Sequence, residues 1–159
     1  MSGWKSINMK HLSALLFVAI MMVFTACNKD VADSATSTSI VGTWELRQTS
    51  AAMLPTPFNY PVGNGTVLKF TDTTYESYDK GTFVKSGNYT IVKDSTFEEN
   101  ICMLPEPGMF SHRIIYDGNS TTTKRFIQVI GNKLIFMSGC YAVDAGTYTQ
   151  YEKISESGK

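Results

Sequence analysis

Residues 126–137 read FIQVIGNKLIFM, two apolar runs on either side of Gly131-Asn132. A Gly-Asn pair between two such runs signals a two-residue hairpin turn, because both residues tolerate the positive φ that the turn needs. Asp117-Gly118-Asn119 follows another apolar run and indicates a second turn. Consecutive strands joined by short turns predict an antiparallel meander.

The same period-two pattern begins near Val41 and continues along the chain. In residues 43–48, Trp44 and Leu46 share one face of a strand, while Glu45 and Arg47 share the other, which predicts one buried and one wet face. Ser86-Gly87 is either a turn or a bulge in one bent strand. Further strands are expected at residues 66–70, 74–78, 82–85, 88–93, 97–103, 111–116, 124–130, 133–137 and 147–154.

Eight or nine short antiparallel strands in one small chain leave a sandwich or a closed barrel, since both protect the edges of a sheet. A meander of hairpins favours the barrel. The sequence therefore predicts an all-β domain over residues 41–155, folded as an up-and-down antiparallel β-barrel.

The composition fits one globular domain and excludes one class of partner. The chain has 159 residues, of which 43% are hydrophobic and 18% charged, and its fourteen basic and fourteen acidic side chains balance. Nucleic-acid binding depends on an excess of Lys and Arg that neutralises phosphates. No nucleic-acid partner is expected.

The first 26 residues have the layout of a secretory signal. Residues 12–26 read LSALLFVAIMMVFTA, an uncharged apolar stretch preceded by Lys5 and Lys10. A bilayer-spanning helix needs roughly 20 apolar residues, so this stretch is short for a permanent span. An uncleaved N-terminal anchor is the alternative.

Phe24-Thr25-Ala26-Cys27 resembles the bacterial lipobox, in which the cysteine is acylated and becomes the first residue of the mature protein. The resemblance implies a membrane partner, reached through a lipid anchor in the bacterial cell envelope, at the outer membrane and facing either the periplasm or the cell surface. Residues 27–40 have the small polar composition of a flexible tether. An incidental cysteine in a signal sequence is the other interpretation.

Cys102 and Cys140 remain as an even pair in a chain expected in an oxidising compartment, which predicts a disulfide between them. Two buried free thiols are the alternative, because sequence cannot show how closely they approach. Zinc fits poorly, since there is no C-x-x-C motif and only His112 remains after the signal. Neither a metal nor a cofactor is expected.

Gly42-Thr43-Trp44 resembles the G-x-W signature of lipocalins and the wider calycin group, and residues 87–91, 132–136 and 146–153 resemble strands of lipocalin-like domains on Bacteroidetes lipoproteins. The resemblance spans about residues 41–154. It implies that Trp44 closes one barrel end beneath a basic side chain of the last strand, for which Lys153 is the matching position.

Small barrels commonly bind a ligand in the mouth or interior, against apolar walls. Alternation places Tyr75 and Tyr78 on opposite faces without showing which is inside. The loop 100–110 is either a lid or partner-contact patch, or a segment that Cys102 pins while its apolar residues pack inward. Candidate ligand contacts are Tyr75, Tyr78, Phe83, Tyr89, Phe126, Tyr148 and Tyr151, and loop candidates are Met103, Leu104, Met109 and Phe110.

Catalysis is the minority hypothesis. A hydrolase or isomerase would depend on His112, and G-x-S-x-G does not occur in the chain. Glu98 and Glu99 are adjacent, and on a strand they would point to opposite faces. The leading hypothesis is a lipid-anchored, non-catalytic protein that binds a small, apolar ligand. A protein-interaction or inhibitor module that uses the loop 100–110 is the second.

Overall fold

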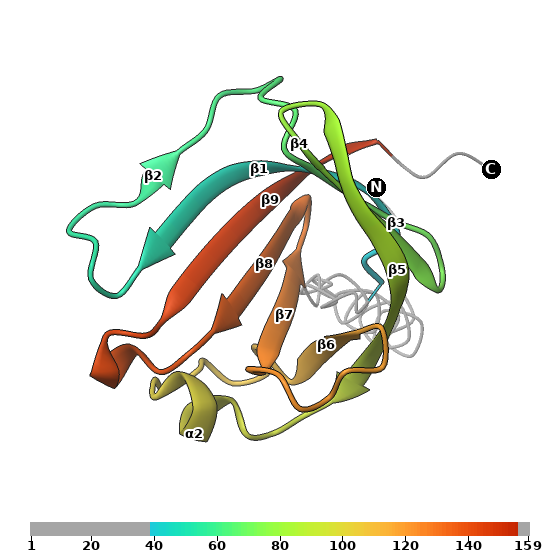
Figure 1. Cartoon of the computed structure of the whole chain (residues 1–159). Helices are drawn as coiled ribbons and strands as arrows, with labels where there is room; N and C mark the ends of the chain where they lie inside the picture. Colours follow the sequence, from blue (N-terminus) through green and yellow to red (C-terminus); the bar gives the residue numbers. More distant parts are fainter. Residues whose placement is uncertain (1–38, 156–159) are drawn as a thin grey trace, which may run out of the picture. The chain divides into compact units, whose positions relative to one another are not determined.

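The computed structural model describes residues 39–155, which form one antiparallel sheet. The predicted signal (1–26), Cys27 and the tether as far as residue 38 lie outside the described residues. Within the described range, strands follow each other along the chain with two short helical turns (Figure 1). The strands are β1 (Gly42–Ala51), β2 (Phe58–Asn59), β3 (Val67–Phe70), β4 (Thr74–Asp79), β5 (Thr82–Lys93), β6 (His112–Tyr116), β7 (Arg125–Ile130), β8 (Lys133–Ser138) and β9 (Thr147–Ser155), and the helices are α2 (Phe97–Ile101) and the 3-10 helix η2 (Tyr141–Val143).

The sheet closes on itself because its first and last long strands pair. From β3 to β9 each strand pairs with the next along the chain, and β1 pairs with both β3 and β9. The β1–β9 ladder runs from Thr43, opposite Ser155, to Ala51, opposite Thr147. Eight strands form the barrel, and β2 is an extra strand beside β1. This confirms the predicted all-β, up-and-down antiparallel barrel.

Alternate side chains point into the barrel, where apolar ones form the main core. On β7, Ile127 and Val129 lie in this core, whereas Phe126 belongs to a separate cluster. Burying one Val, Ile or Phe side chain fully stabilises the fold by roughly 1.5–3 kcal/mol. The core consists of Ile40, Trp44, Phe70, Tyr75, Ile114, Ile127, Val129, Leu134 and Phe136.

A second apolar cluster lies between α2 and the outer face of β7 and β8. Phe97 and Ile101 are buried and one helical turn apart, so they share a face of α2. The Phe97 ring stacks on Phe110 with centroids 4.8 Å apart and meets Phe126 edge-on at 5.3 Å. The outward-facing Phe126 of β7 and Ile135 and Met137 of β8 are therefore covered.

The strand predicted at residues 97–103 is wrong, because Phe97–Ile101 forms α2. The placement of Glu98 and Glu99 on opposite faces of a strand is wrong for the same reason. Both carboxylates lie in the first turn of the helix and are exposed. On a strand Phe97, Glu99 and Ile101 would share one face, which would bring a carboxylate into the apolar cluster, whereas on a helical turn Phe97 and Ile101 share a face without Glu99.

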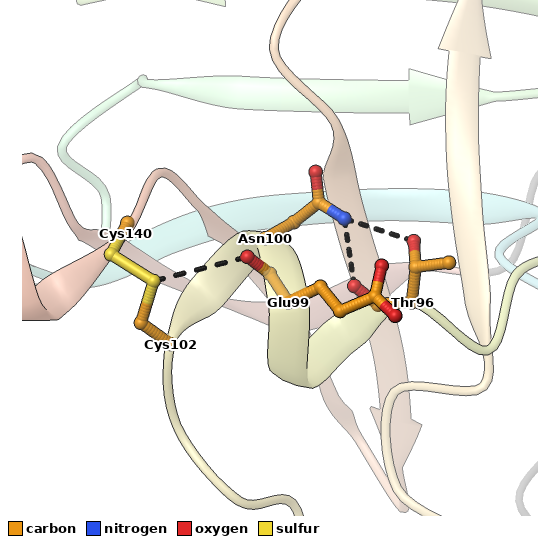
Figure 2. Close-up of a disulfide and its surroundings, with 5 residues drawn as sticks. All are labelled: Thr96, Glu99, Asn100, Cys102 and Cys140. Carbon is orange, nitrogen blue, oxygen red and sulfur yellow. Dashed lines mark hydrogen bonds between the residues drawn. A yellow bond between two sulfur atoms is a disulfide. The ribbon is translucent and has the colours of Figure 1, made fainter.

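Cys102 follows α2 directly and forms a disulfide with Cys140, as predicted (Figure 2). Their Cα atoms are 5.0 Å apart. Within the turn, Asn100 Nδ2 donates hydrogen bonds to Thr96 O at 2.8 Å and Thr96 Oγ1 at 2.9 Å. The disulfide joins the β5–β6 connection to the β8–β9 connection, and so holds α2 against the barrel.

The outer face of β1 is not wet at Glu45, so that part of the prediction is wrong. Glu45 is 4% exposed and accepts hydrogen bonds from Gly63 N at 3.0 Å and Gly65 N at 3.1 Å. Arg47 Nη1 lies 2.6 Å from Glu45 Oε2, and Arg47 Nε lies 2.9 Å from Glu152 Oε2. Burial raises the pKa of Glu45, but these hydrogen bonds and the charge of Arg47 outweigh it and lower the pKa.

Asp94 joins the end of β5 to α2, β6 and β7. It accepts hydrogen bonds from Thr96 N at 2.9 Å and Thr96 Oγ1 at 2.6 Å, and its Oδ2 lies 3.0 Å from Lys124 Nζ. Arg113 Nε lies 2.9 Å from the same oxygen as an ion-pair contact. Burial opposes ionisation of Asp94, yet the Thr96 and Lys124 contacts outweigh it and lower the pKa of Asp94 to about 2.

We expect Asp94→Asn to remove a pH-dependent part of the stability. A carboxyl whose pKa is lower in the folded than in the unfolded chain stabilises the fold above its unfolded pKa, about 3.9, and loses this effect as the pH falls. Urea unfolding should show wild type about 2 kcal/mol more stable than the variant above pH 4, with the gap closing toward pH 2.

The exposed Asp144 provides the matched control, since Asp144→Asn removes a carboxylate that takes part in no ion pair among residues 39–155. Its pH profile should follow wild type. A gap between wild type and Asp94→Asn that stays constant with pH would contradict the assignment.

Candidate functional site

A partly open cavity of about 460 Å³ lies on the inner face of the barrel. Ligand pockets in proteins are typically about 300–1,000 Å³, so this space suits a small molecule. The cavity is lined by Leu68 of β3, Tyr75 and Ser77 of β4, Lys85 of β5, Ile114 and Tyr116 of β6, Arg125 of β7, and Asp117, Asn119, Thr122 and Thr123 of the β6–β7 connection.

Unequal strand lengths open this part of the barrel. Ser86-Gly87, predicted as either a turn or a bulge in one bent strand, lies within β5, a continuous strand of twelve residues, whereas β6 has five. Figure 1 shows that β5 is much longer than β6. Residues 82–88 pair with β4, and residues 89–93 pair with β6. The first half of β5 therefore extends past the end of β6, and the β6–β7 connection lines the resulting gap.

Two cationic side chains, Lys85 and Arg125, stand at this opening and are exposed. Lys85 Nζ lies 5.7 Å from the centroid of the Tyr75 ring and 5.9 Å from that of Tyr116. Arg125 Cζ lies 6.0 Å from the Tyr116 centroid and 5.7 Å from that of Phe136. Both cations thus lie close to the Tyr116 ring, at cation–π distance.

Asp117 anchors the β6–β7 connection to the wall of the cavity. Its Oδ1 accepts a hydrogen bond from Asn88 N at 2.9 Å, and its Oδ2 accepts one from the Tyr75 hydroxyl at 3.0 Å. Gly87 makes room for this carboxylate, because a Cβ at that position would collide with Asp117 Oδ1. Because Gly87 has no side chain, the β6–β7 connection can lie close to β5 at this position.

The two tyrosines of the cavity remain protonated hydroxyl groups. Burial raises the pKa of Tyr116, although the nearby Arg125 charge acts in the opposite direction. Burial also raises the pKa of Tyr75, and its hydrogen bond to Asp117 and the charge of that carboxylate act in the same direction. Both phenols can donate or accept a hydrogen bond at neutral pH.

The aromatic ligand candidates occupy four different environments. Tyr75 lines the cavity. Tyr89 and Tyr151 pack against the interior core, and Phe126 and Tyr148 belong to the cluster beneath α2. Tyr78 and Phe83 pair edge-on across β4 and β5, and Phe83 is exposed. The predicted opposition of Tyr75 and Tyr78 is observed, with Tyr75 inside.

Of the four loop candidates, two pack inward and two are exposed, so each interpretation of the loop 100–110 fits part of it. Phe110 is buried and Met109 packs against the cluster beneath α2. Met103 and Leu104 are exposed, Leu104 by 81%, and line an open hollow beside Cys102 and the two helical carboxylates. Packing therefore accounts for Met109 and Phe110, and only Met103 and Leu104 present an apolar surface.

His112 begins β6, and its Nδ1 lies 3.0 Å from Ser111 Oγ. Ser111 directly precedes this strand, and His112 is not part of the cavity lining. Trp44 and Lys153 are opposite each other in the β1–β9 ladder, with Lys153 Nζ 5.6 Å from the centroid of the Trp44 ring. Trp44 Nε1 donates a hydrogen bond to Ile40 O at 2.7 Å.

Sequence reasoning missed the polar part of the cavity, which includes Ser77, Lys85, Tyr116, Asp117 and Arg125. Alternation relates Lys85 to Gly87 and Tyr89 on one face of β5, but it does not show that this face points inward. For Asp117 the sequence predicts only a place in a turn. The register between paired strands would have revealed these residues. For example, Ser77 stands opposite Lys85 across the β4–β5 ladder.

Comparison of the chain with known protein families, with curated proteins and with solved structures finds no match. In residues 39–155, no helix is long and apolar enough to cross a membrane. Over the same range, no three His, Cys, Asp or Glu side chains gather where they could hold a metal ion. The candidate site is therefore defined by its geometry.

We expect Gly87→Ala to displace the Asp117 carboxylate and to destabilise the fold. Forcing a methyl group into a filled space typically costs about 1–3 kcal/mol, measured by urea unfolding. In the background of Asp117→Gly, which removes the colliding group and suits the positive φ of residue 117, the same change should cost much less.

Ser86→Ala is the matched control, because Ser86 is the exposed neighbour of Gly87 on the same strand. It should change stability by less than about 0.5 kcal/mol. An equal cost of Gly87→Ala in both backgrounds would show that Asp117 is not what the glycine accommodates.

Proposed function

We propose that this chain is a lipid-anchored binding protein of the bacterial cell envelope, and that its barrel holds a small molecule in the cavity beside Lys85 and Arg125. The cavity of about 460 Å³ carries this proposal. A barrel made only to be stable would gain by filling this space with side chains, since cavities are costly.

Sequence features support the anchored part of the proposal. The apolar run before Cys27 and the lipobox-like residues around it fit export followed by acylation. The G-x-W resemblance to lipocalins agrees with a barrel in which Trp44 is 1% exposed and lies near Lys153. A lipid-anchored barrel on a tether would hold its binding site close to the membrane.

The walls of the cavity offer both apolar and polar contacts. Leu68 and Ile114 provide aliphatic surface, and the rings of Tyr75 and Tyr116 provide flat faces. Ser77 and the β6–β7 connection add hydroxyl and amide groups that can orient a ligand. The bound molecule therefore has an apolar part that lies against these walls.

Filling the cavity should abolish binding. Ser77→Trp places a large ring on the inner face of β4, and Ser86→Trp places the same ring on the neighbouring strand, where residue 86 is exposed and outside the cavity lining. We expect native mass spectrometry of protein from its own cells to show a bound small molecule on wild type and on Ser86→Trp, but not on Ser77→Trp.

The proposal fails if wild type carries no such molecule, or if Ser77→Trp retains it. Circular dichroism and thermal unfolding should show that both tryptophan variants remain folded. If Ser77→Trp is unfolded, the smaller Ser77→Leu takes its place with the same expectation.

Acylation is tested by mass spectrometry of the non-reduced mature protein. We expect its first residue to be Cys27 carrying acyl chains, and Cys102 and Cys140 to be joined with the loss of two hydrogens.

Cys27→Ser removes the residue that would carry the acyl chains. Because membrane anchoring depends on those chains, the variant should leave the membrane fraction. A mature chain with an unmodified Cys27 would contradict the anchor.

A further inference from the structure

The cavity carries an excess of positive charge. Lys85 and Arg125 are cationic, and Asp117 is the one carboxylate among the lining residues. Ion pairs within residues 39–155 form around Glu45 and Asp94, and neither Lys85 nor Arg125 takes part in them. Both carboxylate oxygens of Asp117 already accept hydrogen bonds from Asn88 and Tyr75.

The two cations lie near the same aromatic ring. Lys85 Nζ and Arg125 Cζ lie 5.9 Å and 6.0 Å from the centroid of the Tyr116 ring, and both side chains line the same cavity. An anion in this cavity would interact with two positive charges and one negative charge among the lining side chains, which gives a net attraction. Guanidinium and ammonium groups also provide several hydrogen-bond donors each.

Apolar and aromatic groups lie directly beside the cations. Leu68, Ile114 and the Tyr75 and Tyr116 rings line the same cavity. A free inorganic anion would leave these surfaces without a partner. An organic body attached to the anionic group would cover them and contribute about 25 cal/mol for each Å² of apolar surface buried.

We propose that the ligand is a small organic anion, with a carboxylate, sulfonate or sulfate group held by Lys85 and Arg125 and an aromatic or alicyclic body against Leu68, Ile114 and Tyr116. This rests on the proposed function of the cavity as a binding site. It replaces the sequence-based expectation of an apolar ligand with a ligand that has one charged end.

A pair of probes that differ in charge but not in shape tests this assignment. 1-Naphthalenesulfonate and its neutral amide, 1-naphthalenesulfonamide, are titrated calorimetrically into the full chain purified in detergent, with protein-free micelles as the blank. We expect the sulfonate to bind wild type at least tenfold more tightly than the sulfonamide, a ratio that corresponds to about 1.4 kcal/mol. Added NaCl should weaken binding of the sulfonate alone.

Charge removal in the cavity should abolish this preference. In Lys85→Met combined with Arg125→Met, the affinity ratio should fall to about one, while sulfonamide affinity changes less than about twofold. The matched control combines Lys93→Met with Lys133→Met, which removes two exposed charges outside the cavity lining. This control should keep the wild-type ratio.

The outcomes separate the two proposals. If both probes bind equally to wild type and Ser77→Trp abolishes both, the cavity is a binding site but the anion assignment is wrong. A preference for the sulfonate that survives in the Lys85 and Arg125 variant also overturns the assignment. If neither probe binds wild type, both the cavity's role in binding and the anion assignment are overturned.

Discussion

Hydrogen bonding between β1 and β9 is the constraint on which the rest of the structure depends. The two strands lie at opposite ends of the described chain and pair from Thr43 to Ala51 of β1. Without this ladder each strand would present a free edge, and the meander would have no interior. Closure also brings Lys153 over Trp44, with 5.6 Å between the ammonium and the ring centroid. The interior core and the cavity both exist because the sheet closes.

Closure does not make the barrel uniform, because its strands differ in length. Where β6 pairs with β5, at residues 89–93, the interior is filled by side chains such as Ile91 and Ile114. Beyond Tyr116 the β6–β7 connection replaces a strand, and Gly87 lets Asp117 approach β5 and fix that connection. The cavity is thus built by a short strand and an anchored loop, without any break in the sheet.

Much of this fold could be predicted from local patterns, while the site could not. Hairpin turns such as Gly131-Asn132 and the alternation around Trp44 depend on neighbouring residues, and they predict strands and a barrel correctly. The segment at Phe97 was misassigned because five residues are too few to distinguish a strand from a helical turn that packs on a sheet. The cations at Lys85 and Arg125 require register, which depends on pairing between distant strands and is not visible in either strand alone.

One cross-strand row shows how apolar and charged side chains are divided within the barrel. Trp44 stands opposite Leu68 of β3, and Ser77 of β4 stands opposite both Leu68 and Lys85 of β5. Along this row the inward-facing side chains change from fully apolar to charged. A cation is tolerated on an inner face only where water or an opposite charge can reach it, since burying an unpaired charge is very costly. The apolar end of the row therefore stabilises the fold, and the charged end lies at an opening, where it contributes little to folding and where the proposed ligand would contact it.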